Sequence, residues 1–305
     1  MSNSRLKIWL SAFRLRTLPL ALSCVFMGTA LAFSLGKFNI FIFIATIVTT
    51  ILLQILSNLA NDYGDGVTGT DNENRIGPQR AVQSGSISLK GMKTAIIINV
   101  LLCLLSGCFL LFLSFGASHF LLALLFLLLG VASIAAAIKY TVGSNAYGYS
   151  GFGDLAVFVF FGLVGVMGTH FLFALHLDWL NILPAICIGL CSVGVLNLNN
   201  MRDIENDKAS QKNTIPVVLG LINAKRYHLL VLTIALSSIL VYSLLTYRSL
   251  MQLLYFLVLP LFVKHLIEVK KCLHNKDFNP MLPKLAIATF LLSLLFFIGE
   301  MLSKH

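Results

Sequence analysis

Long apolar runs recur along this chain of 305 residues, and they constrain its fold more than any other feature of the sequence. A helix needs about 20 consecutive apolar residues to cross the ~30 Å hydrocarbon layer of a membrane. Runs of that kind lie at residues 18–36, 40–60, 93–115, 118–140, 154–175, 179–200, 228–247, 250–268 and 284–302. We therefore predict an all-α, multi-pass membrane protein with about nine transmembrane helices, forming one domain over residues 1–305.

The composition excludes a soluble or disordered chain. Hydrophobic residues make up 58% of the sequence and charged residues only 11%, whereas charged residues make up roughly 25% of typical soluble domains. Outer-membrane barrels show short segments in which apolar and polar residues alternate, a pattern that this sequence lacks. The membrane-spanning elements are therefore predicted to be helices.

Basic residues indicate how the spans are oriented. When the connections between spans are assigned alternately to two sides, one side receives all but three of the 22 Lys and Arg residues. Cytoplasmic loops carry such an excess, which places the amino terminus and the long polar loops 61–92 and 201–227 in the cytoplasm. This bias and the attraction of anionic lipids account for the net charge of +10, so no nucleic-acid partner is expected.

Oxygen-bearing side chains gather where the second apolar run ends. If the helix continues past residue 60, Asn58, Asn61, Asp62 and Asp65 lie on one of its faces, and Asp71 follows shortly after. A solvated helix end would explain one such acid. It does not explain several that converge, because like charges on one helix face repel each other and ionisable groups near a bilayer are costly.

A second cluster of the same kind follows the sixth run, where Asn200, Asp203 and Asp207 share one helical face. Carboxylate oxygens are hard ligands that suit Mg²⁺, which binds one or two carboxylates and takes its other ligands from water and substrate phosphate. The predicted metal ligands are Asp62, Asp65, Asp71, Asp203 and Asp207.

Cations accompany both acidic clusters. Arg75 and Arg80 follow the first cluster, and Lys208 and Lys212 follow the second. Carboxylates for a metal and Arg or Lys for phosphate oxygens are the groups that a diphosphate site needs, and Arg can bind two oxygens at once.

These motifs resemble those of the UbiA superfamily of intramembrane aromatic prenyltransferases, N-D-x-x-D-x-x-x-D and D-x-x-x-D. The run Asn61-Asp62-x-x-Asp65 matches the first motif, but Gly69 stands at its third acid, and Asp71 lies two residues further on. The run Asp203-x-x-x-Asp207 matches the second motif in full. The resemblance extends along the chain through Arg16-Thr17-Leu18-Pro19, Gly77-Pro78-Gln79-Arg80, Tyr140-Thr141-Val142-Gly143 and Tyr147-Gly148-Tyr149.

The resemblance implies helices around a central cavity and a Mg²⁺-dependent reaction. A polyprenyl group would pass from polyprenyl diphosphate to an aromatic acid, with 1,4-dihydroxy-2-naphthoate as the expected acceptor. Carbon dioxide would be lost and demethylmenaquinone formed, a step of menaquinone biosynthesis. The chain would contact these two substrates and membrane lipids; neither the prenyl chain length nor the oligomeric state follows from the sequence.

The resemblance also assigns roles to residues. Expected catalytic residues are Asp62, Asp65, Asp203, Asp207 and Lys139. Expected substrate-binding residues are Asn58, Asn61, Arg75, Arg80, Tyr140, Tyr147, Asp154, Asn200, Lys208 and Lys212. Lys139 could meet the acceptor's carboxylate or extend from a helix end towards water, and Asp154 could orient the acceptor or cap the fifth span.

Two alternatives stay open at this point. The acceptor could be another aromatic compound, namely 4-hydroxybenzoate, homogentisate or haem. A secondary transporter also places acids in membrane helices, but near the bilayer midplane, whereas all five aspartates here are expected at the cytoplasmic level.

Overall fold

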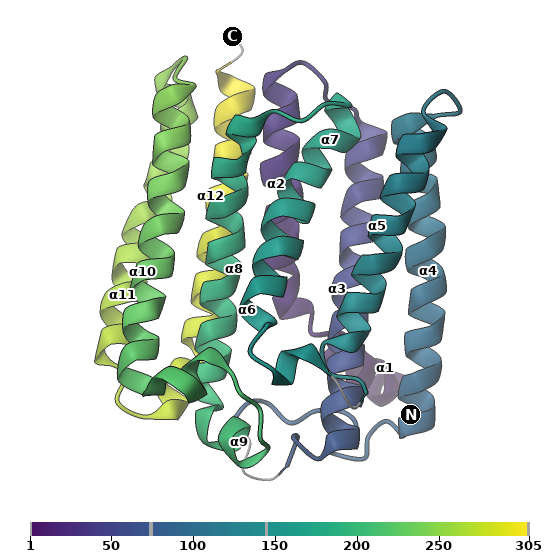
Figure 1. Ribbon diagram of the computed structural model, residues 1–305, viewed down its shortest axis with the longest axis vertical. Helices are drawn as coiled ribbons and strands as arrows, with labels where there is room; N and C mark the ends of the chain where they lie inside the picture. Colours follow the sequence, from purple (N-terminus) through teal and green to yellow (C-terminus); the bar gives the residue numbers. More distant parts are fainter. Residues whose placement is uncertain (1, 73–75, 144–145, 304–305) are drawn as a thin grey trace.

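The computed structural model describes residues 2–72, 76–143 and 146–303, and over these ranges the chain is helical, without a β-strand (Figure 1). Nine helical segments within these ranges are long and apolar enough to cross a membrane, which confirms the predicted fold class. The α-helices are α1 (Ser2–Phe13), α2 (Leu18–Ser34), α3 (Ile40–Thr68), α4 (Leu89–Phe115), α5 (Phe120–Lys139), α6 (Gly153–Val157), α7 (Thr169–Ala174), α8 (Ile182–Arg202), α9 (Ile204–Ala209), α10 (Ile215–Leu245), α11 (Leu259–Lys271) and α12 (Met281–Leu302).

Shorter or differently wound helical segments connect them. They are η1 (Leu15–Thr17), η2 (Tyr147–Tyr149), η3 (Phe158–Gly168), η4 (Trp179–Asn181), η5 (Leu250–Val258) and η6 (Asn275–Phe278). The segment η3 is a π-helix that joins α6 and α7 into one continuous span, Gly153–Ala174.

Two helix boundaries differ most from the predicted spans. Helix α3 continues through Thr68 instead of ending at residue 60 and stops at Gly69, whose φ of 74° is the left-handed conformation favoured at helix ends. Helix α10 begins at Ile215 rather than 228, because Thr214 is extended and Pro216 suits the first helical turn. It is kinked at Gly220, whose φ of 73° and ψ of 160° are not helical. Most of the expected loop 201–227 is therefore helical.

The interior lies between α2, α8, α10 and α12 (Figure 1). Helix α8 packs against α10 and η3, and α12 packs against α2 and η5. The fully buried side chains Met27, Ile188, Leu232 and Phe296 come from these four helices. By contrast, Leu121 of α5 is 78% exposed, as expected of a helix that faces lipid.

Helix α8 and η3 approach each other at two glycines. A Cβ atom on Gly162 would lie 2.7 Å from the carbonyl oxygen of Ala185, and one on Gly189 would lie 2.9 Å from the ring of Phe158. Small residues permit such backbone contact between membrane helices. This crossing holds α8, which carries the second acidic cluster, against the fifth span.

We expect Gly162→Ala to destabilise the protein by about 1–3 kcal/mol, because the added methyl group overpacks the contact. The matched control is Gly130→Ala in α5, where a Cβ atom meets nothing within 4 Å. That change should be neutral or stabilising, since alanine favours helix. Thermal unfolding in detergent measures both; equal midpoints for the two variants would contradict the packing.

Candidate functional site

Asp62 and Asp65 lie in the last turns of α3 and are both buried. The carboxylate of Asp62 accepts hydrogen bonds from the backbone amides of Ala81 and Val82, each at 3.2 Å. These two hydrogen bonds hold the segment that carries Arg80 against the end of α3.

Arg80 joins the acids of the first cluster. Its Nη1 donates to Asp65 at 2.7 Å and to the backbone oxygen of Asn61 at 2.8 Å, and its Nε lies 3.0 Å from a carboxylate oxygen of Asp71. Burial by itself lowers the pKa of Arg80, but the carboxylates Asp65, Asp71 and Asp62 outweigh burial and raise it. The guanidinium therefore stays charged and offsets the carboxylates around it.

The second cluster is not one continuous helix. Helix α8 ends at Arg202, Asp203 has non-helical dihedral angles, and α9 begins at Ile204. Arg202 binds Asp203 through two contacts, Nε to Oδ1 at 2.8 Å and Nη2 to Oδ2 at 2.5 Å, and it also donates to Asn199. Arg202 was not among the predicted site residues, because residues adjacent in sequence rarely share a helix face.

Asp207 in α9 faces Lys212. The two charged groups lie 3.8 Å apart, and the backbone amide of Lys212 donates to the carbonyl of Asp207 at 2.8 Å. Burial raises the pKa of Asp207 to about 6, and the Lys212 ammonium group opposes that rise. Burial alone would lower the pKa of Lys212, but Asp65 and Asp207 outweigh it and raise the pKa.

The two clusters meet through polar contacts. The side-chain amide of Asn206 in α9 donates to the carbonyl of Thr70, at 2.9 Å. The hydroxyl of Tyr149 donates to Asp65 at 2.8 Å, and its backbone oxygen accepts from the amide of Asn213 at 2.9 Å. The ammonium group of Lys212 lies 5.4 Å from the centroid of the Tyr149 ring. Asp65 and Asp207 therefore belong to one site.

Asn206 was absent from the predicted site, and Tyr149 was expected near it only as part of the motif Tyr147-Gly148-Tyr149. Only their neighbourhood in the motifs pointed to them, since both act by joining segments more than 50 residues apart. The hydroxyl of Tyr149 also lies within 2.9 Å of Thr68 and 2.7 Å of Thr70.

A polar cavity of about 240 Å³ opens beside Asp62, between the end of α1 and the segment 78–81. Arg14, Arg16 and Arg80 line it together with Asp62. Arg14 has the left-handed dihedral angles φ 49° and ψ 55°, which turn the chain between α1 and η1. Three guanidinium groups around one cavity form a site suited to an anion with several oxygens. Arg14 and Arg16 were not among the predicted site residues.

Other predicted residues lie around this centre. Asn58 donates to the carbonyl of Phe13 at 2.9 Å and to the hydroxyl of Thr17, so it ties α3 to the chain that bears Arg14 and Arg16. Asn200 is buried near the end of α8.

The tyrosines and Asp154 form a further group. The rings of Tyr140 and Tyr147 meet edge to face, with centroids 5.4 Å apart. The carboxylate of Asp154 accepts a hydrogen bond from the hydroxyl of Tyr227 at 2.8 Å. Lys139 and Lys208 are exposed. Arg75 lies outside the described residues.

The donors around the two clusters fit a divalent cation of the hard type. Within the described residues no three His, Cys, Asp or Glu side chains form a ready cage. The available donors are carboxylate oxygens and the amide oxygen of Asn206, which is buried and accepts no hydrogen bond. An all-oxygen set with few carboxylates per ion suits Mg²⁺.

The Arg202–Asp203 pair offers a test of the site's electrostatics. Arg202→Met should destabilise the protein by about 3 kcal/mol or more, because it leaves a buried carboxylate unpaired. The double variant Arg202→Met with Asp203→Asn removes that charge and should recover part of the loss. Thermal unfolding in detergent distinguishes them; a double variant less stable than the single one would contradict this electrostatic account.

Comparison with known proteins gives close relatives. A sequence model of the UbiA prenyltransferase family matches residues 21–279. The 1,4-dihydroxy-2-naphthoate octaprenyltransferase of Escherichia coli is 45% identical over 302 residues, which cover 99% of this chain and 97% of that protein. The protein of the same name from Haemophilus influenzae is 43% identical over 98% of this chain and 97% of its own.

A solved structure shares the fold at low sequence identity. The apo structure of a UbiA homologue from Aeropyrum pernix superposes with a TM-score of 0.70, at 15% identity, over 91% of this chain and 96% of the other.

Proposed function

Because the chain belongs to the UbiA prenyltransferase family, we infer that its buried acidic site transfers a polyprenyl group from polyprenyl diphosphate to 1,4-dihydroxy-2-naphthoate. The carboxylate of the acceptor is lost as carbon dioxide, and demethylmenaquinone forms on the way to menaquinone. The names of the relatives favour an octaprenyl donor. One observation supports this proposal most strongly. The two acidic segments are joined through Asn206 and Tyr149, beside a cavity lined by arginines.

Mg²⁺ is the metal that we propose. Asp65 of the first cluster and Asp207 of the second would hold it with the amide oxygen of Asn206, since no three carboxylates among the described residues form one cage. The other predicted ligands, Asp62, Asp71 and Asp203, belong to the same two clusters. When bound, Mg²⁺ neutralises charge on the diphosphate leaving group.

The protein's own cations act on the same group. Arg80, Arg14 and Arg16 line the cavity beside Asp62, and Lys212 stands at the opposite cluster. As the bond from carbon to the diphosphate oxygen lengthens, negative charge grows on the departing oxygens. Cations held in place beforehand stabilise that charge more in the transition state than in the bound substrate, which accelerates the step.

Aromatic rings lie beside the acidic site, where we propose that the allylic carbon is held. Tyr149 reaches Asp65, and the pair Tyr140 and Tyr147 lies on the chain segment just before it. Ring faces attract a cation, and these half-buried rings limit the access of water that would otherwise capture it. These tyrosines therefore protect the allylic cation until the acceptor's ring carbon attacks it.

The acceptor would lie on the side of Asp154. A Cβ atom on Gly153, the residue before Asp154, would meet the Tyr140 hydroxyl at 3.1 Å, so this segment adjoins the tyrosines. We propose that Asp154, held by Tyr227, orients an acceptor hydroxyl. Lys139 is exposed, and its proposed contact with the acceptor's carboxylate requires its side chain to turn inward.

We also propose that the site faces the cytoplasm from a bacterial inner membrane. The excess of basic residues at the end of the bundle that bears the aspartates supports this orientation. Substrates would then bring their polar groups from the cytoplasmic surface and leave their tails in the lipid.

Replacing one acid of either cluster should abolish turnover. Purified protein with Mg²⁺, octaprenyl diphosphate and each candidate aromatic acid should give a prenylated, decarboxylated product, identified by mass, from dihydroxynaphthoate. We expect Asp65→Asn and Asp207→Asn each to lower the rate by at least 100-fold, about 2.7 kcal/mol of barrier. Asp178→Asn, which changes an acid that caps η4, is the matched control. Near-normal turnover in the two site variants would reject the metal role, and product from another acid alone would reassign the acceptor.

Arg80→Gln should change the KM for the diphosphate substrate much more than the KM for the aromatic acid. Loss of a charge-assisted hydrogen bond of about 1.5–3 kcal/mol predicts a KM for the diphosphate that rises about 10- to 100-fold. The KM for the aromatic acid should change little. Steady-state kinetics with each substrate varied in turn gives both values, and an equal rise in both would move Arg80 out of the diphosphate site.

A further inference from the structure

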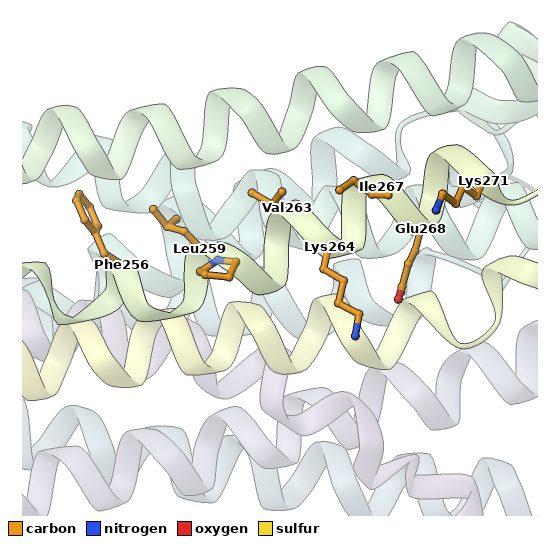
Figure 2. Close-up of a pocket in the computed structure, with 8 residues that line it drawn as sticks. Phe256, Leu259, Val263, Lys264, Ile267, Glu268 and Lys271 are labelled. Atoms are coloured by element: carbon orange, nitrogen blue, oxygen red, sulfur yellow. The ribbon is translucent and has the colours of Figure 1, made fainter.

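An apolar groove runs along the outer face of the eighth span and shares no lining residue with the cavity beside Asp62. It has a volume of about 760 Å³, and its walls come from η5 and α11. Figure 2 shows Phe256, Leu259, Val263 and Ile267 in a row along this face, followed by Lys271. Val263 and Ile267 are about half exposed, so the row is open to its surroundings.

The groove has the length of one membrane leaflet. Phe256 and Lys271 are 15 residues apart, which corresponds to roughly 22 Å of helix, and one leaflet with its headgroup region is about 20–22 Å thick. Helix α11 ends at the same end of the molecule as the aspartates, because Arg202 donates to Asn279 in the chain just beyond it. The groove therefore extends from the depth of the membrane to its surface.

The charged residues of the groove all lie in the half nearer the membrane surface. Lys264 and Lys271 lie two helical turns apart on this face, with Glu268 between them. Glu268 is paired with Lys284 of α12 at 2.6 Å, and Figure 2 shows both Lys264 and Glu268 pointing towards that helix. With Glu268 offset by Lys284, the ammonium groups of Lys264 and Lys271 leave a surplus of positive charge.

We propose that this groove binds an anionic phospholipid of the adjacent leaflet. One acyl chain would lie along Phe256, Val263 and Ile267, and the phosphate would lie between Lys264 and Lys271. Lysine side chains are long enough to bury their stems along an apolar surface and bring their charged ends to one headgroup. Basic pockets at membrane helices bind acidic lipid headgroups in this way.

The groove is placed for a lipid rather than for the prenyl donor. Helix α11 lies at one edge of the bundle, and α3, which carries Asp62 and Asp65, lies on the other side of α8 and α12 (Figure 1). A diphosphate held at Lys264 could not reach these aspartates. The proposal therefore does not depend on the proposed prenyl transfer.

Native mass spectrometry of the purified protein tests the groove with two lipids of identical acyl chains, phosphatidylglycerol and phosphatidylcholine. We expect tighter binding of phosphatidylglycerol to the unchanged protein. Lys264→Gln with Lys271→Gln should weaken that binding about tenfold and leave phosphatidylcholine binding unchanged. Val263→Trp, which fills the groove, should weaken the binding of both lipids.

The matched control is Lys90→Gln with Lys93→Gln, two exposed lysines at the start of α4. These changes should leave phosphatidylglycerol binding as it was. Equal binding of the two lipids, or an equal loss in the control, would overturn the proposal in favour of general surface charge. Displacement of bound phosphatidylglycerol by an equimolar amount of octaprenyl diphosphate would overturn it in favour of a substrate site.

Discussion

The burial of negative charge at the ends of α3 and α8 is the constraint on which the rest of the site depends. A carboxylate taken out of water without a partner costs several kcal/mol, so each buried acid needs a cation or a donor. Arg80 forms ion pairs with Asp65 and Asp71, and Arg202 forms one with Asp203. The backbone amides of Ala81 and Val82 donate hydrogen bonds to Asp62. Because the buried carboxylates need these partners, the connecting segments fold back onto the helix ends, and distant parts of the chain come together.

The same contacts explain how a bundle of membrane helices can bind a water-soluble leaving group and an apolar prenyl chain at the same time. The charged groups sit at one end of the bundle, while the spans above them present apolar side chains. Cations that offset the aspartates are within reach of an anion in the adjoining cavity. The same placement of charged groups at one end of the bundle therefore accounts for the chemistry of the site and for its position in the membrane.

The sequence predicted the spans well, because apolar length is a local property, and it predicted the convergence of Asp62 and Asp65 because helix periodicity fixes which residues share a face. Thr214 and Pro216 also indicate in the sequence that α10 starts early, but apolar runs alone do not reveal this start. The contacts of Tyr149 and Arg14 could not be predicted in this way. They depend on how segments far apart in the chain pack, which periodicity does not describe.

The central claim is that both acidic clusters form one cation site together with a diphosphate. The most direct measurement is the affinity for Mn²⁺, a spectroscopic substitute for Mg²⁺, in the presence of inorganic diphosphate, followed by electron paramagnetic resonance. We expect a neutral residue at Asp65 or at Asp207 alone to weaken Mn²⁺ binding at least tenfold. Unchanged affinity after either substitution would show that the clusters bind independently, and would contradict the account.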